Sequence, residues 1–335
     1  MIGYAPSTPT GVVADFFRLG FVGVPIFFAL SGFLIAHVSQ KTDAIRFGVN
    51  RIFRLMPGFW ASMTLSFIVL MVLGSPHEVT FKTWAANLFL LPQIAGEPFV
   101  DGVYWTLVYE FVFYGWAAVF LFFGIFHRYL LWICAGWLAI ATANVFVLQI
   151  GAIDRIFIAT FAGAFIIGLS LWHIYQHGRS FFAMGLIAAS SLHLSFGLRT
   201  ASLQDYLPNP PEQLSLVFCL IISALIVGIV SLAIFGPQIK RNTDLLVTLG
   251  AISYPLYLIH QEIGYAVFRH LAFLDQPVLL ALLMTLVSVV LAYAIHEVAE
   301  TPLRNWLQSK FMPLTARLAD RINAINPFGH SLKPL

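Results

Sequence analysis

Charged residues are scarce in this chain: Asp, Glu, Lys and Arg make up only 10% of its 335 residues. Soluble domains carry about a quarter, so this shortage excludes an ordinary soluble domain and indicates a membrane protein. Cysteine is also rare, and Cys134 and Cys219 both lie inside apolar runs. That placement argues against a disulfide framework or a thiolate metal site. The basic residues form no block, which excludes the basic patch that nucleic-acid binding requires.

Apolar residues make up 59% of the chain, and its mean hydropathy is +0.86. A helix needs about 20 apolar residues to cross the hydrocarbon core of a bilayer. The sequence therefore predicts an all-α, polytopic membrane bundle with about nine transmembrane helices. They are placed at 19–38, 57–74, 104–125, 128–148, 154–174, 180–197, 214–235, 247–268 and 277–297.

Two other stretches interrupt this series. The apolar run 84–92 is too short to span a bilayer and predicts an interfacial or re-entrant piece. The connection 198–213 carries Pro208, Pro210 and Pro211, so it cannot be helical throughout.

The distribution of Lys and Arg predicts the orientation. The connections after the first, third, fifth and seventh spans and the C-terminal tail hold 13 of the 18 basic residues, and the opposite side holds 5. The positive-inside rule then predicts a cytoplasmic C-terminus. We expect a short extracytoplasmic segment at 1–18, a transmembrane domain at 19–304 and a cytoplasmic tail at 305–335. Part of this tail, FMPLTARLADRINAI, is amphipathic and fits the inner leaflet surface.

Two segments near the start carry unusual patterns. The run Gly20–Leu34 contains small residues that permit close helix packing, and helix packing is its simplest interpretation. Arg51 and Arg54 are three residues apart, so they share one face of a helix. Two guanidinium groups on one face can bind phosphates, although for the pair taken alone ordinary cytoplasmic anchoring of the helix is the preferred interpretation.

Ionisable residues inside predicted spans are costly and indicate a site or a buried pair. Glu110 lies within the predicted span 104–125. A functional role is the preferred interpretation, and the alternative is a pairing with an Arg or Tyr that only stabilises the helix bundle. His260 follows the Tyr254–Pro255 step, which we expect to kink or interrupt its helix.

Other ionisable residues point to structure instead of chemistry. Glu297 and Glu300 precede Pro302, and we expect an ion pair with a basic segment and a helix stop at this proline. His173 and His177 lack the acidic residue of a zincin motif, so the sequence predicts no metal site.

Several of these segments together resemble the acyltransferase-3 family of integral-membrane O-acyltransferases. They are GVPIFFALSGFL, RIFRLMPGFW, the E-x-x-F-Y pattern that begins at Glu110, the Ser-Tyr…His segment ending at His260, and ETPLR. The resemblance implies that Arg51 and Arg54 bind the phosphates of acyl-CoA and that Glu110 is catalytic. The residues it implies as cavity lining are Ser31, Gly32, Trp105, Tyr254 and His260.

The resemblance also implies the chemistry. An acetyl or other acyl group would pass from acyl-CoA, as co-substrate and not as a bound cofactor, to a hydroxyl of a cell-surface carbohydrate or glycolipid precursor. The expected partners are acyl-CoA, the carbohydrate or glycolipid acceptor and membrane lipids, with no nucleic acid. The expected location is a bacterial inner membrane.

One feature of the family has no counterpart here. The family usually has about ten helices, and the first carries an Arg and a His that acts as general base. The segment before Gly20 holds no His and no span, so the chain is expected to lack this helix. His37 is a conceivable substitute base. The alternative function is therefore a catalytically inactive or truncated family member that acts as a binding or partner membrane protein.

Overall fold

The computed structural model describes residues 19–75, 78–201, 214–237, 243–274 and 276–325. In these residues the chain is helical, with no strand, so the predicted all-α class is confirmed. Eight of the described helices are long and apolar enough to cross a membrane, and a shorter apolar helix lies at Thr243–Ile259. The chain is a multi-pass membrane protein. The predicted segment 1–18 and residues Pro208, Pro210 and Pro211 lie outside the described residues.

The helices fall into two compact units. The first unit contains Val49–Val108 and Gln238–Arg317, and the second contains Asp15–Gly48, Tyr109–Pro237 and Leu318–Leu335. The chain passes from one unit to the other within three helices, α3 (Ala44–Leu73), α5 (Trp105–Phe122) and α14 (Thr301–Ile325).

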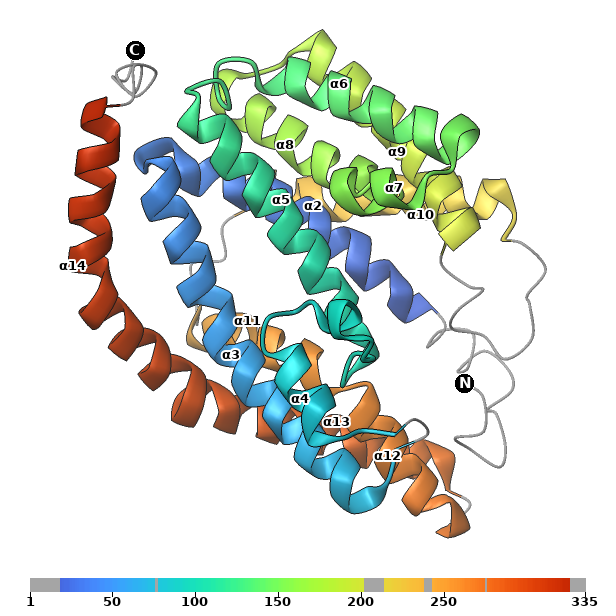
Figure 1. Cartoon of the computed structure of the whole chain (residues 1–335). Coiled ribbons are helices and arrows are strands. Elements are labelled where there is room, and N and C mark those ends of the chain that lie inside the picture. The colour runs from blue at the N-terminus through green and yellow to red at the C-terminus, as the bar shows by residue number, and fades with distance from the viewer. Residues whose placement is uncertain (1–18, 76–77, 202–213, 238–242, 275, 326–335) are drawn as a thin grey trace. The chain divides into compact units, whose positions relative to one another are not determined.

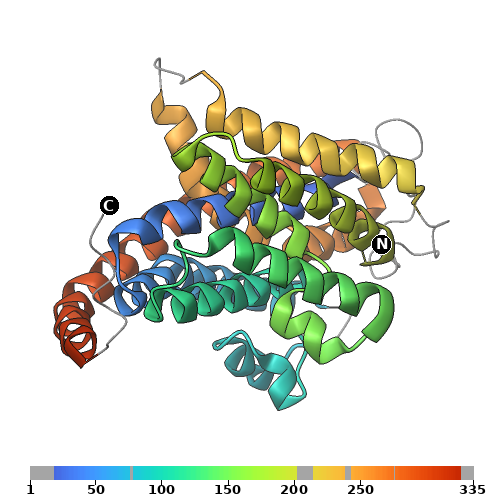
Figure 2. The same ribbon diagram turned by 90° about the horizontal axis from the view of Figure 1, so that it is seen from above.

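The second unit is built around α8 (Ala162–His177), which is buried from Ala162 through Trp172. The helices that pack against it most extensively are α2 (Gly23–Val38), α6 (Leu130–Ala143) and α9 (Phe181–Ala201) (Figure 1). The helix α10 (Leu216–Phe235) runs beside α9, as Figure 2 shows. A π-helical turn at Asn144–Leu148 and the short helix α7 (Gly151–Phe157) connect α6 to α8.

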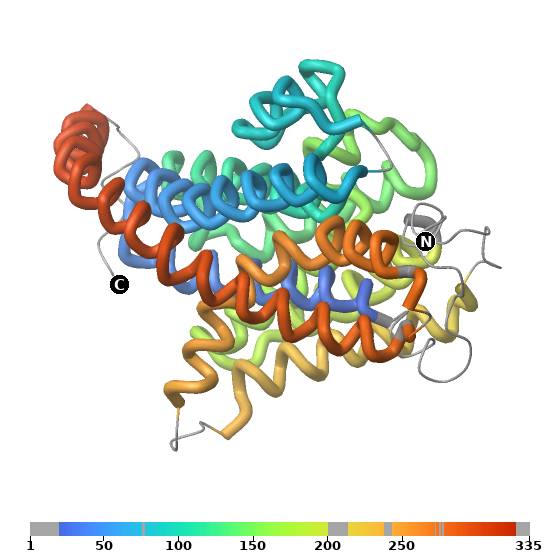
Figure 3. The backbone as a smooth tube through the Cα atoms, turned by 90° about the horizontal axis from the view of Figure 1, so that it is seen from below, coloured from blue at the N-terminus to red at the C-terminus, as the bar shows by residue number. Residues whose placement is uncertain are grey.

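The first unit contains most of α3, which is blue in Figure 3, and most of the C-terminal helices, which are orange and red there. Its members are α11 (Thr243–Ile259), α12 (Glu262–His270), α13 (Pro277–Ile295), the π-helical turn His296–Glu300 and the part of α14 up to Arg317. Its buried apolar cluster consists of Ile252, Ile259, Ile263, Met284, Ala292 and Ile295. The predicted short piece at 84–92 contains the end of α4 (Phe81–Asn87), whose seven residues cannot span a bilayer.

Helix α3 begins earlier than the predicted span 57–74. Asp43 precedes it and accepts hydrogen bonds from the backbone N–H groups of Ile45 and Arg46, as an N-cap residue does. Arg46 adds an ion pair with Asp43 at 2.7 Å. The sequence around Arg51 and Arg54 is therefore helical, and both arginines lie on one face of α3.

The predicted span 247–268 was wrong as a single helix. It is divided into α11 and α12 by a turn at His260 and Gln261, and Pro255 lies inside α11 without interrupting it. Membrane helices tolerate an interior proline when neighbouring groups satisfy the backbone groups that it frees. The break lies instead where Asp101 Oδ2 accepts the backbone N–H of Glu262 at 3.1 Å and so caps the new helix.

The helix stop expected at Pro302 was also wrong. The chain remains helical from α13 through the π-helical turn His296–Glu300 into α14, and Pro302 lies in the first turn of α14. A proline ring clashes with the carbonyl four residues earlier in a regular helix. The wider π turn just before Pro302 provides a place for the chain to accommodate that clash.

Candidate active site

Glu110 lies on α5 in the second unit and is almost fully buried, with 2% of its surface exposed. Its Oε1 atom accepts hydrogen bonds from Ser31 Oγ, at 3.3 Å, and from the hydroxyl of Tyr114. Tyr114 is one helical turn further along α5, so helix geometry places its hydroxyl beside the carboxylate. Two hydroxyl donors therefore meet one buried carboxylate oxygen.

Close packing of α2 against α8 positions Ser31. A Cβ atom at Gly32 would overlap the backbone carbonyl of Phe165, and one at Gly168 would overlap the carbonyl of Ala29. Glycine at these two positions lets the helix backbones approach each other. The space beside Gly32 is thus occupied by α8, and the role of Gly32 as cavity lining stays a prediction.

The surroundings of Glu110 suit a functional carboxylate. A charged residue at the middle of a membrane helix costs roughly 2.5–3.5 kcal/mol on insertion scales. Hydrogen bonds to a charged group recover roughly 1.5–3 kcal/mol each, so Ser31 and Tyr114 offset much of this cost. A buried carboxylate that accepts from hydroxyls can also hold a substrate hydroxyl or accept its proton.

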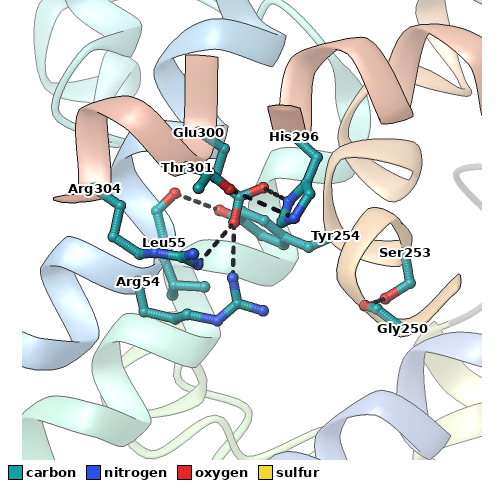
Figure 4. A network of polar contacts seen from close by, with 9 residues as sticks. All are labelled: Arg54, Leu55, Gly250, Ser253, Tyr254, His296, Glu300, Thr301 and Arg304. Atoms are coloured by element: carbon teal, nitrogen blue, oxygen red, sulfur yellow. Dashed lines mark hydrogen bonds and ion pairs between the residues drawn. The ribbon is translucent and has the colours of Figure 1, made fainter. Parts of the chain in front are cut away.

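In the first unit, a buried carboxylate lies among cations (Figure 4). Glu300 is fully buried, and its Oε1 accepts from Arg54 Nη1 at 2.7 Å and lies 3.7 Å from Arg304 Nη1. Its Oε2 lies 3.1 Å from His296 Nδ1. The ion pair expected for Glu300 is therefore present, and its partner is Arg54 of the predicted phosphate-binding pair.

Tyr254 joins the same region. Its hydroxyl donates to the carbonyl of Leu55 at 3.0 Å, beside Arg54 in the sequence (Figure 4). A Cβ atom at Gly58 would lie 3.0 Å from the ring of Tyr254 and 3.3 Å from the carboxyl carbon of Glu300. The structure thus brings Arg54 and Tyr254 together in the first unit, around a carboxylate that neutralises only part of the local positive charge.

The other predicted residues of the first unit lie near the break between α11 and α12. Trp105 is half-buried at the start of α5, and its neighbour Thr106 is hydrogen-bonded to the hydroxyl of Tyr257 at 2.8 Å. His260 is exposed in the turn, with Nδ1 2.7 Å from the carbonyl of Tyr257. The start of α5 and the helix break are therefore linked by hydrogen bonds.

The two remaining candidates have simpler surroundings. Arg51 is half-buried on α3, one turn before Arg54. His37 is exposed near the end of α2, where its ring contacts Phe33 and Tyr175. Among the residues that the structure describes, no group of three or more His, Cys, Asp or Glu side chains is arranged to hold a metal ion.

Comparison with known proteins decides the family. The model of the acyltransferase-3 family, described as an acyltransferase domain, matches residues 1–297. This chain belongs to the acyltransferase-3 family. It is also 25% identical to the "Putative acetyltransferase ORF330" of Acidianus two-tailed virus over 307 residues, which cover 86% of this chain and 81% of that protein. No solved structure matches the chain.

Membership of the acyltransferase-3 family makes this protein an acyltransferase. Two residues beside the candidate carboxylates, one in each unit, were not recognised as site residues from sequence. Tyr114 was visible only as the last letter of the E-x-x-F-Y pattern, and its spacing of four from Glu110 was the available signal. His296 likewise lies four residues before Glu300, and this helical spacing was its available signal.

Proposed function

We propose that this acyltransferase moves an acetyl or other acyl group from acyl-CoA to a hydroxyl of a cell-surface carbohydrate or its glycolipid precursor. The hydroxyl oxygen would bond to the acyl carbonyl carbon as the carbon–sulfur bond breaks. The hydroxyl proton would pass to a base and end on the sulfur of the departing CoA. A sugar hydroxyl is a poor nucleophile at neutral pH, so the reaction needs a group that orients it and removes this proton.

The contact of Ser31 and Tyr114 with the buried carboxylate of Glu110 carries the proposal. In this proposal Glu110 holds the acceptor hydroxyl, or orients and charges the base that deprotonates it. The hydrogen bonds that Oε1 accepts from the hydroxyls of Ser31 and Tyr114 support this role. In the second unit Ser31 and Gly32 would line the substrate cavity, and in the first unit Trp105, Tyr254 and His260 would do so.

Arg51 and Arg54 are the proposed phosphate-binding residues for acyl-CoA. Arg54 has five N–H donors and directs Nη1 at Glu300, so the rest of its guanidinium can face a phosphate. Guanidinium groups match phosphate oxygens in pairs, and Arg51 lies on the same helix face. Arg304 adds a further positive charge beside Glu300.

The distribution of basic residues supports a cytoplasmic C-terminus, with 13 Lys and Arg on that side against 5 on the other. The proposed location is a bacterial inner membrane. In this orientation the arginine pair faces the compartment in which acyl-CoA is made.

The test follows radiolabelled acetyl-CoA in membranes that contain the full chain. Label should enter the carbohydrate fraction with wild-type protein and fall by at least roughly 100-fold with Glu110→Gln. Glu297→Gln is the matched control, because Glu297 is exposed and outside the candidate site. Normal transfer by both Glu110→Gln and Arg54→Ala would overturn these roles. Binding of acetyl-CoA without any turnover by the wild type would indicate the inactive binding protein instead.

A further inference from the structure

The C-terminal helix α14 carries two exposed stripes that the acyltransferase proposal does not use. Successive residues of a helix are about 100° apart. On this basis one apolar stripe falls within a sector of about 60°. It consists of Leu307, Phe311, Leu314, Leu318 and Ile325. The last four of these side chains are between 43% and 82% exposed, so protein atoms leave much of this stripe uncovered.

A row of basic residues lies directly beside the apolar stripe. Lys310, Arg317 and Arg321 fall within a sector of about 40° that is centred about 70° from the stripe, and all three are exposed. Trp306 is 53% exposed and lies next to the same row. Tryptophan beside basic residues is typical of the headgroup level of a bilayer.

On the flank of the apolar stripe away from the basic row, α14 packs against the rest of the protein. Thr315 and Ala319 are buried there, and Gln308, Met312 and Ile322 are half-buried. Asp320, the one acidic residue of α14, forms an ion pair with Arg46 at 2.6 Å. The three exposed basic residues outnumber Asp320, which is paired, so the net exposed charge of this helix is positive, and the basic row borders the exposed apolar surface.

From this arrangement we infer that α14 is a membrane-surface helix that binds anionic phospholipid. Its apolar stripe enters the boundary between headgroups and acyl chains, and its basic row contacts lipid phosphates. A surface helix of this kind buries its apolar face about 5–10 Å into that boundary. Each basic residue near an anionic surface strengthens the attraction about fivefold. This role is independent of the acyl-transfer chemistry.

The experiment places a single spin label on the full chain in vesicles of 70% phosphatidylcholine and 30% phosphatidylglycerol. Cys134 and Cys219 are buried and are replaced by Ala in the background variant. Leu318→Cys lies on the apolar stripe, and Ser309→Cys is the control, nine residues away and on the opposite face of the helix. The label at 318 should be more accessible to oxygen, and the label at 309 to a water-soluble nickel complex.

The charge test repeats the measurement with Lys310→Gln, Arg317→Gln and Arg321→Gln combined. The three substitutions should shift the balance between docked and undocked helix by up to about 100-fold. In vesicles of phosphatidylcholine alone, they should have little effect. Equal aqueous accessibility at both labels would overturn the inference. A label at 318 that stays in lipid whatever the charge or vesicle composition would overturn the role of anionic lipid.

Discussion

Arg54 and Glu300 are 246 residues apart in the sequence, and Nη1 of Arg54 donates to Oε1 of Glu300 at 2.7 Å. The carboxylate is fully buried, whereas the Arg54 side chain is 39% exposed. This pair connects α3 to the segment that joins α13 to α14. It also orients one of the two arginines that we propose as phosphate ligands. The first predictions test these two consequences separately.

Replacing Glu300 should destabilise the protein. Glu300→Ala leaves Arg54, His296 and Arg304 without the carboxylate that they share. Removing one partner of a fully buried ion pair costs roughly 3–5 kcal/mol, and the cost here should be smaller because Arg54 is 39% exposed. We expect a clear fall in the Tm of the detergent-solubilised protein. Glu297→Ala, three residues away and exposed, should leave the Tm unchanged, and equal Tm values for the two variants would contradict this account.

Replacing Arg54 by lysine should weaken acyl-CoA binding. Lysine keeps the charge but lacks the planar fork that can serve a carboxylate and a phosphate together. Loss of one charge-assisted hydrogen bond corresponds to roughly a 10- to 100-fold rise in the KM for acyl-CoA. Arg304→Lys is the control, since Arg304 shares Glu300 but is not a predicted phosphate ligand. Similar KM values for both variants would count against Arg54 as a ligand.

The hydroxyl groups around Glu110 should matter for turnover. Glu110→Gln removes the proposed catalytic carboxylate, and kcat should fall by roughly 10²- to 10⁴-fold. Tyr114→Phe and Ser31→Ala each remove one donor to Oε1 and should lower kcat by roughly 10- to 100-fold. Tyr129→Phe tests an exposed tyrosine and should have no effect. A normal kcat for Tyr114→Phe would show that its contact serves packing alone.

The glycines between α2 and α8 should tolerate no side chain. Gly32→Ala and Gly168→Ala each place a methyl group against a backbone carbonyl of the other helix. Overpacking of this kind costs roughly 1–3 kcal/mol, so both variants should have a lower Tm. Gly136→Ala on α6 is the control, because nothing lies within 4 Å of its added Cβ. There the better helix propensity of alanine should leave the Tm unchanged or raise it.

Titration of Asp101 should make the stability of the protein depend on pH. It is fully buried just before the span that begins at Gly102, and burial raises its pKa to about 7 against the opposing effect of two backbone N–H donors. The unfolded chain titrates near 3.9, so the native state binds more protons between these values. The stability contributed by Asp101 is therefore complete below about pH 4 and is lost as the pH rises to about 7.

The measurement compares the Tm of the wild type and of Asp101→Asn from pH 5 to pH 8. Asparagine cannot titrate, so the fall in Tm with rising pH should be smaller in the variant. Its Tm should also be lower overall, since only one side-chain oxygen remains for the N–H groups of Val103 and Glu262. Parallel profiles for the two proteins would assign the pH dependence to other groups.

Much of the fold follows from apolar length alone. Eight of the nine predicted spans lie on helices that the structure has long enough to cross a membrane. The remaining prediction, a single helix at 247–268, was wrong at His260. The helix break there depends on a cap from Asp101, about 160 residues earlier. The helix stop at Pro302 failed for a related reason, since a local π turn lets the helix continue.

The candidate site was only partly predictable. A carboxylate in a membrane span is energetically costly, which is why the sequence predicts Glu110 as a candidate site residue. The partners of Glu110 and Arg54 were harder to recognise, because Ser31 lies 79 residues before Glu110 and Glu300 lies 246 residues after Arg54. Sequence spacing reports neighbours only within one helix.

The sequence by itself determined that this protein is an all-α, multi-pass membrane protein, and its motifs indicated the acyltransferase-3 family. Those properties depend on composition and local pattern. An apolar segment inside a bilayer must satisfy its own backbone hydrogen bonds, and a helix does so. Only the tertiary structure decided that Glu110 accepts from Ser31 and that Arg54 is paired with Glu300. Such contacts depend on how helices distant in the sequence pack, and a packed interior selects partners by shape and hydrogen-bonding geometry that no single segment encodes.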